Sequence, residues 1–172
     1  EWGDLDCLVI DSPPGTGDEP LSVAQLVGFN SAAVIVTTPQ MIAIDDVRRS
    51  ISFCEQLALP VAGIIENMSG FYCPHCGELS DLFSSGGGEK LAAETGVAFL
   101  GKIPITPEIA KGGDNGQTFV KEYAQTAAAK TFDKIVDSLI SKTEKNDNQI
   151  KEKTQMKIAI PTAGKTLCMH FG

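Results

Sequence analysis

Two cysteines separated by two residues are the side chains of this sequence with the most direct chemistry. They are Cys73 and Cys76, within the segment FYCPHCG at residues 71–77. A C-x-x-C turn brings two thiolates close enough to bind one metal ion or one edge of an iron–sulfur cluster. A tetrahedral zinc site needs two further ligands, but the sequence contains no second C-x-x-C pair and only two histidines. The residues alone leave zinc, redox and iron–sulfur roles open, with incidental thiols as a smaller alternative.

A carboxylate that directly follows an apolar run is the second candidate centre. Residues 7–10, CLVI, are all apolar, Asp11 comes next, and the turn-forming segment SPPGTG follows at residues 12–17. A strand that is apolar on both faces is typical of a parallel sheet covered by helices, in which ligands bind beyond the carboxyl ends of the strands. Asp11 is therefore expected at such an end, where an aspartate can hold hydrated Mg²⁺ beside nucleotide phosphates. The alternative is an aspartate that only terminates a strand.

Apolar segments alternate with helical ones along most of the chain. Besides the first strand, we expect strands at residues 32–38, 61–67 and 99–103, and helices at residues 20–29, 42–57, 89–95 and 119–141. Thr106 and Pro107 are typical of the N-cap and first turn of one more helix. The alternation predicts an α/β fold, with a parallel sheet flanked by helices on both faces. Cys7 and Cys54 fall at core-facing positions, where cysteine behaves as a small apolar residue.

The composition argues against several classes of protein. Of the 172 residues, 14 are Lys or Arg and 22 are Asp or Glu, which gives a formal net charge of −8. Nucleic-acid binding needs a basic patch, which this net charge does not favour. A transmembrane helix needs about 20 mostly apolar residues, and no apolar run in the sequence approaches that length. We therefore expect no nucleic acid and no membrane among the partners. Five cysteines without an export signal indicate reduced thiols or metal ligands in a cytoplasmic protein.

Four segments of the chain resemble those of a known family. They are DSPPGTGDE at residues 11–19, ENMSG at 66–70, CPHCG at 73–77 and GKIPI at 101–105. The first resembles the Walker B and switch II segment of the deviant-Walker-A P-loop ATPases. Together the segments are similar to the Mrp/ApbC family of iron–sulfur cluster carriers, in the MinD/ParA-like superfamily. The similarity extends over roughly residues 1–140.

The resemblance implies ATP, Mg²⁺ and a labile 4Fe–4S cluster as cofactors. It makes Asp11 the catalytic aspartate, and it implies that Asn67 hydrogen-bonds the adenine edge while Pro104 lies against the ring. Cys73 and Cys76 would bind the cluster at a homodimer interface, because two thiolates per chain supply half of the usual four. The implied function is ATP-dependent cluster assembly, with transfer of the cluster to iron–sulfur apo-proteins. A MinD/ParA-like ATPase switch and a zinc-stapled structural domain are the alternatives.

We expect the chain to be a piece of a longer protein. It contains no G-x-x-x-x-G-K-[ST] motif, and the glycine run at residues 86–90 has neither a preceding strand nor a Ser or Thr after its lysine. Residues 1–141 are predicted to form the C-terminal part of a P-loop ATPase domain. The family hydrolyses ATP, but this part lacks the P-loop and is expected to be inactive alone. Residues 142–155 predict a polar linker. Residues 156–172 predict the truncated start of a second domain, which resembles the opening of dinitrogenase iron–molybdenum cofactor-binding domains.

Overall fold

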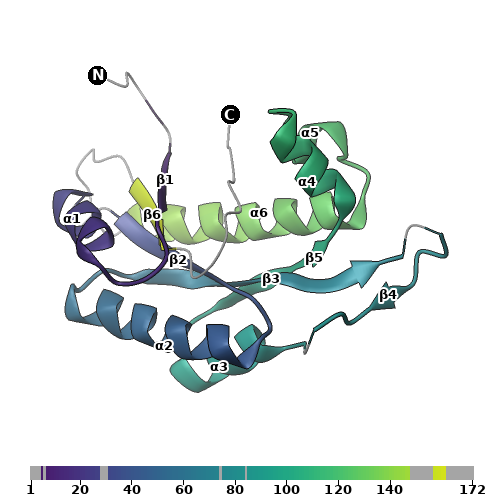
Figure 1. Cartoon of the computed structure of the whole chain (residues 1–172). Helices are drawn as coiled ribbons and strands as arrows, with labels where there is room; N and C mark the ends of the chain where they lie inside the picture. Colours follow the sequence, from purple (N-terminus) through teal and green to yellow (C-terminus); the bar gives the residue numbers. More distant parts are fainter. Residues whose placement is uncertain are drawn as a thin grey trace.

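Strands and helices alternate along the chain in the structure, a computed structural model (Figure 1). It describes residues 5, 7–27, 31–73, 75–83, 85–147 and 157–161. The elements follow in the order β1 (Leu8–Ser12), α1 (Asp18–Val27), β2 (Ser31–Thr37), α2 (Met41–Gln56), β3 (Val61–Tyr72), β4 (Leu79–Ser80), α3 (Gly87–Thr95), β5 (Phe99–Ile105), α4 (Pro107–Asp114), α5 (Phe119–Glu122), α6 (Ala127–Asp147) and β6 (Lys157–Pro161).

The strands form one sheet of six, in which most neighbours are parallel. The order is β1-β6-β2-β3-β4, and β5 pairs with β3. The pairs that join β1, β6, β2, β3 and β5 are all parallel, whereas β4 runs antiparallel to β3. Parallel strands deliver their carboxyl ends to one edge of the sheet, which is where open α/β proteins bind ligands.

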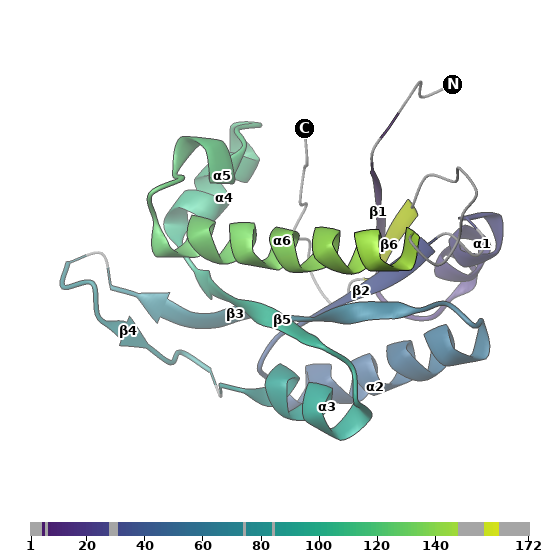
Figure 2. The same ribbon diagram turned by 180° about the vertical axis from the view of Figure 1, so that it is seen from behind.

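Helices cover both faces of this sheet. The two opposite views show α2 and α3 on one face and α6 on the other (Figures 1 and 2). Successive side chains of a strand point to opposite faces, so neighbouring residues of β2 and β3 enter different cores. One core joins Val34, Val36, Ile65 and Ile103 to Phe119, Phe132 and Ile135 of α5 and α6. The other joins Ile35 and Ile64 to Ile44, Val47, Ile51 and Leu91 of α2 and α3.

The predicted fold class is confirmed. The structure is α/β, with a largely parallel sheet between helical layers. The helix predicted at residues 42–57 is present as α2, because its apolar residues recur every three or four positions and bury Ile44, Val47 and Ile51. In the part of the chain that the structure describes, no helix combines the length and apolar character needed to cross a membrane.

Two strands are longer than the sequence predicts. β3 continues past Asn67 to Tyr72, and β5 continues through Pro104 to Ile105. The extension of β3 is held by antiparallel pairing with β4 and by the pairing of Phe71 with Ile105. Both partners lie far from β3 in the sequence, so the local pattern contains no sign of them.

The single helix predicted at residues 119–141 is wrong. α5 ends at Glu122 and α6 begins at Ala127. The hydroxyl oxygen of Thr126 accepts a hydrogen bond from the backbone N–H of Ala129 at 3.2 Å. This is the bond made by an N-cap residue, and it starts a new helix where the apolar pattern alone continues.

The end of the described chain returns to the sheet. α6 continues to Asp147, into the segment predicted as a linker, and β6 pairs in parallel with both β1 and β2. A strand near the start of residues 156–172 is therefore present, and it adds to the sheet already described. Residues 162–172, which carry most of the resemblance to cofactor-binding domains, lie outside the described residues. The division of the chain into domains stays a prediction.

Candidate functional site

The residues expected at a nucleotide lie on three strands of the parallel sheet. Asp11 is exposed near the end of β1, and Asn67 is buried within β3. Pro104 is buried on β5, directly after Ile103, the register partner of Asn67. The structure thus brings Asn67 and Pro104 together on neighbouring strands. β6 and β2 separate β1 from β3, so Asp11 lies three strand spacings, about 14 Å, to the side of Asn67. The pairings also align Ile10 with Ala159, Ala33 and Val61, so Asp11 lies further back along the strands than Asn67 does.

The backbone is irregular where β3 passes Asn67. Met68 has a φ of 57°, a left-handed conformation that is uncommon for residues other than glycine. The register between β3 and β5 shifts between Asn67 and Phe71, as in a β-bulge. The backbone N–H of Met68 donates to the side-chain oxygen of Asn67 at 2.9 Å. With its oxygen held in this way, the Asn67 side chain can offer its amide N–H groups to a ligand.

A buried hydroxyl lies between β5 and α4. Thr106 has the extended backbone of an N-cap residue and precedes Pro107, as predicted, but its side chain makes no capping hydrogen bond. Within the described residues, its Oγ1 is buried and has no hydrogen-bond partner. Thr106 follows Pro104 by two residues. Buried polar atoms in proteins normally have a partner, so a polar ligand group at this edge would satisfy the hydroxyl.

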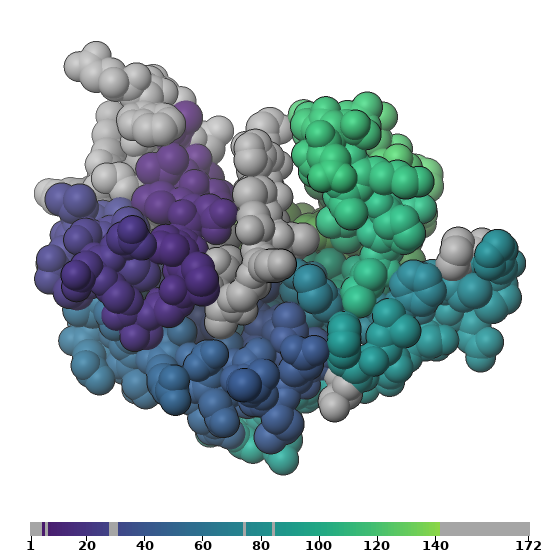
Figure 3. All heavy atoms as spheres, viewed as in Figure 1, coloured from purple at the N-terminus to yellow at the C-terminus, as the bar shows by residue number. Residues whose placement is uncertain are grey.

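The cysteine pair lies at the tip of the hairpin formed by β3 and β4. Cys73 is half-buried directly after β3, and Cys76 is exposed. The backbone N–H of Cys73 donates to the carbonyl of Glu78 at 2.9 Å, and the N–H of Gly77 donates to the carbonyl of Cys73 at 2.8 Å. The hairpin projects beyond the helices at one end of the molecule (Figure 3). β3 therefore runs from Asn67 almost to Cys73, so the turn with the two cysteines begins directly at the end of a paired strand.

The geometry of this turn lowers the pKa of the Cys73 thiol. The largest cause is a hydrogen bond from the backbone N–H of Cys76, followed by the backbone N–H of His75 and the Cys76 side chain, against a smaller effect of burial. Donors directed at sulfur favour the thiolate, which is the form that binds metals. No group of three or more His, Cys, Asp and Glu side chains is arranged to hold a metal ion among the described residues. The turn itself offers two thiolate ligands, Cys73 and Cys76.

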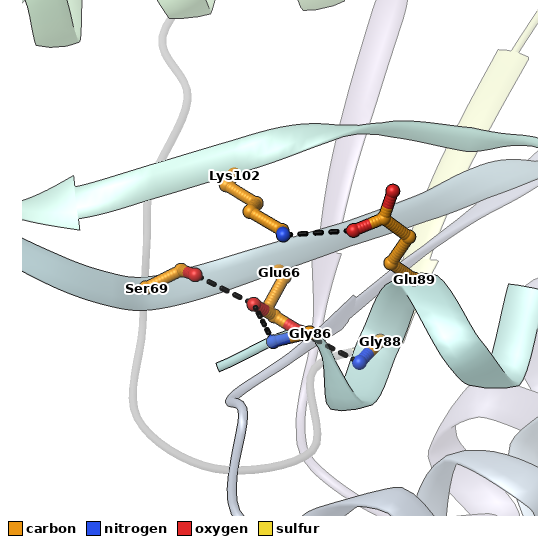
Figure 4. A network of polar contacts seen from close by, with 6 residues as sticks. All are labelled: Glu66, Ser69, Gly86, Gly88, Glu89 and Lys102. Carbon is orange, nitrogen blue, oxygen red and sulfur yellow. Dashed lines mark hydrogen bonds and ion pairs between the residues drawn. The ribbon is translucent and has the colours of Figure 1, made fainter. Parts of the chain in front are cut away.

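A buried carboxylate lies at the base of the hairpin, at a residue for which the sequence alone predicted no role. Glu66 is 0% exposed and lies on β3. One of its oxygens accepts hydrogen bonds from Oγ of Ser69 at 2.5 Å and from the backbone N–H of Gly86 at 3.1 Å. The other oxygen accepts from the N–H of Gly88 at 2.6 Å (Figure 4). The signal in the sequence was an acid after the apolar run VAGII, since a buried charge needs hydrogen-bond partners.

The two other described cysteines differ from each other. Cys54 is buried in α2, as predicted, and burial raises the pKa of its thiol to about 11, with a contribution from the charge of Glu55. Cys7 is exposed, so its predicted core position is wrong. The physical reason is that β1 begins only at Leu8 and is the outermost strand of the sheet, where burial is partial.

Comparison with known protein families finds one family that matches most of the chain. A family described as "ParA: NUBPL iron-transfer P-loop NTPase" matches residues 1–140. The chain belongs to this iron-transfer P-loop NTPase family. The resemblance noted from the four sequence segments is thereby confirmed at the level of the family.

Several relatives of this NTPase are known. The cytosolic Fe-S cluster assembly factor NUBP2 homolog of Trichoplax adhaerens is 48% identical over 142 residues, which are 81% of this chain and 54% of that protein. A nucleotide-binding protein of Archaeoglobus fulgidus, solved in complex with ADP, is 44% identical with a TM-score of 0.61, and the match covers 69% of this chain and 48% of that one. The cell division ATPase MinD of Pyrococcus furiosus shares the fold, at 21% identity and a TM-score of 0.51 over 67% of this chain and 44% of that one. The chain spans about half the length of the curated relatives it matches.

Proposed function

We propose that this iron-transfer P-loop NTPase acts in cytosolic iron–sulfur cluster assembly, as part of an ATP-binding carrier of a 4Fe–4S cluster. The observation that carries the proposal is the Cys73–Cys76 turn at the tip of a projecting hairpin, where backbone N–H groups lower the pKa of Cys73. The family description names iron transfer, and the relative from T. adhaerens is named a cytosolic assembly factor. The cluster is cargo in this proposal, and iron–sulfur apo-proteins are its acceptors.

A homodimer would complete the cluster site. A 4Fe–4S cluster usually takes four cysteine thiolates, and Cys73 and Cys76 supply two per chain, so a two-fold axis through the cluster gives the full set. The return limb of the hairpin also carries Leu79 and Leu82, which are 52% and 55% exposed. Apolar side chains exposed beside the ligands favour a protein interface at this end of the molecule.

The sheet edge fits the base and the metal of a nucleotide. Asn67 would donate to the adenine edge, Pro104 would pack against the ring, and the unpartnered hydroxyl of Thr106 would bond a polar group of the ligand. Asp11 would hold Mg²⁺ through its water shell, and when bound the ion neutralises charge on the phosphates. The ADP in the structure of the A. fulgidus relative supports a nucleotide at this fold.

Anaerobic reconstitution with iron and sulfide tests the proposal. We expect about four irons per two chains and a dimer in solution, whereas a zinc staple would give about one zinc per two chains and no iron chromophore. Cys73→Ser with Cys76→Ser should abolish the chromophore and leave thermal unfolding within a few degrees, because no structural metal is lost. Cys7→Ser is the matched control and should assemble the cluster normally. A full complement of iron in the double variant would show that the ligands lie elsewhere.

A further inference from the structure

We propose that Glu66 is the positioning residue of the cysteine hairpin. Glu66 lies on β3, the outgoing limb of the hairpin. Its buried carboxylate bonds to Ser69 on that limb, to Gly86 at the end of the return limb and to Gly88 in helix α3. Through this contact it sets where Cys73 and Cys76 stand relative to the sheet. The consequence for cluster binding rests on the function proposed above, but the positioning contact does not.

The hydrogen bonds of Glu66 reach the two limbs separately. Ser69 lies on the outgoing limb, four residues before Cys73, and Gly86 lies at the far end of the return limb, ten residues after Cys76. The strand pairing within the hairpin is short, since β4 contains two residues and both are exposed. Such a short antiparallel pair is marginal by itself. The carboxylate therefore supplies a second connection between the limbs, at their base.

Helix α3 provides a rigid anchor for this connection. Its first turn includes Gly88, whose N–H donates to Glu66, and a negative charge is favoured at this end of a helix. Leu91, one turn further along, is buried in the core beneath the sheet. The packing at Gly88 is close: a Cβ there would lie 3.0 Å from Cγ2 of Thr37 and 3.2 Å from a carboxylate oxygen of Glu66. The glycine allows the backbone to approach the carboxylate.

Glu66→Gln tests the role of the charge with little change of shape. The carboxylate accepts from two backbone N–H groups on different oxygens, but an amide has one oxygen and one N–H₂ group. In either orientation of the glutamine, one of the N–H groups of Gly86 and Gly88 faces another donor. We expect amide hydrogen exchange of residues 69–73 and 77–88 to accelerate about tenfold or more, since a hydrogen bond to a charged group is lost.

Two internal comparisons separate local release of the hairpin from general destabilisation. Cys54 is buried in α2, so its alkylation rate reports opening of the core and should not change in Glu66→Gln. Glu89→Gln is the matched control, because Glu89 also lies in the first turn of α3 but forms an exposed ion pair with Lys102 at 2.8 Å. It should leave exchange in the hairpin at the wild-type rate.

The outcome of these measurements decides the proposal. The proposal is overturned if amide exchange in the hairpin of Glu66→Gln keeps the wild-type rate. It is also overturned if exchange in β2 and α2 accelerates as much as exchange in the hairpin. If Glu66→Gln does not fold, Ser69→Ala gives the answer, because it removes one donor to the carboxylate and keeps the charge. That variant should accelerate exchange near residue 69 by a smaller factor. After reconstitution, Glu66→Gln should also lose its iron chromophore in air faster than Glu89→Gln, and equal loss would overturn the effect of the contact on cluster binding. If wild type and both variants form no iron chromophore while the exchange difference is present, the result counts against the proposed function alone.

Discussion

Gly63 on β3 and Leu100 on β5 lie so close together that no side chain fits at position 63. A Cβ there would lie 2.5 Å from Cγ of Leu100 and 2.8 Å from the carbonyl oxygen of Ala98. That carbonyl also accepts a hydrogen bond from the backbone N–H of Ile64 at 2.8 Å, so it cannot withdraw without weakening the pairing of the strands. The pair of strands that carries Asn67 and Pro104 therefore depends on a glycine at this position.

Gly63→Ala is expected to destabilise the protein by about 1–3 kcal/mol, the usual cost of overpacking a core. Urea unfolding followed by circular dichroism measures the change. Gly113→Ala is the control, because nothing lies within 4 Å of a Cβ at that position in helix α4. It should raise the free energy of unfolding by up to about 1 kcal/mol through helix propensity. An unchanged midpoint for Gly63→Ala would show that Leu100 moves aside.

Thr126→Ala tests the interruption between α5 and α6. The Thr126 hydroxyl accepts from the N–H of Ala129, and the loss of such an N-cap costs about 1 kcal/mol. Thr131→Ala is the control within the same helix, since its exposed hydroxyl donates to the carbonyl of Ala127 one turn back and caps no helix end. That change should leave the unfolding midpoint equal or slightly higher. Equal losses for both variants would mean that Thr126 does not start α6.

The features that the sequence predicted correctly are those with a local pattern. Helix α2 is recognisable because its apolar residues repeat at helical spacing, and Cys54 is buried because it belongs to that stripe. The strands that carry Asp11 and Asn67 follow from short apolar runs, although β3 continues past Asn67 to Tyr72. Their roles at a nucleotide were implied by the resemblance, and they stay predictions.

The features that the sequence did not predict depend on partners distant along the chain. The extension of β3 to Tyr72 needs β4, whose two residues give no local signal of a strand. The contacts of Glu66 with Gly86 and Gly88 join residues that are 20 and 22 positions apart. Cys7 is exposed because it precedes β1, a strand at the edge of the sheet, and strand order cannot be obtained from the hydrophobicity of one segment.

The buried thiol of Cys54 should make the protein less stable at alkaline pH. Burial and the charge of Glu55 raise the pKa of this thiol from 9.0 to about 11 in the folded state. Below pH 9 the thiol is neutral in both states and its contribution is fully present. As the pH rises from 9 to 11 the unfolded chain ionises first, so the free energy of unfolding falls. Chemical unfolding at a series of pH values should show a smaller fall in Cys54→Ala than in wild type, and parallel curves would contradict this.

The pKa of the Cys73 thiol is shifted in the opposite direction from that of Cys54, to lower values. Hydrogen bonds to its sulfur lower its pKa, so its thiolate forms at a lower pH than that of an ordinary cysteine, and alkylation should accelerate at correspondingly lower pH. Mass spectrometry of the iodoacetamide-treated protein gives the rate for each cysteine, with buried Cys54 as the slow reference. Because the backbone N–H of Cys76 is the largest cause, Cys76→Ala should keep most of the effect, since it removes only the side-chain contribution. A Cys73 profile that returns to the ordinary range in Cys76→Ala would assign the effect to the neighbouring thiol instead of to the backbone of the turn.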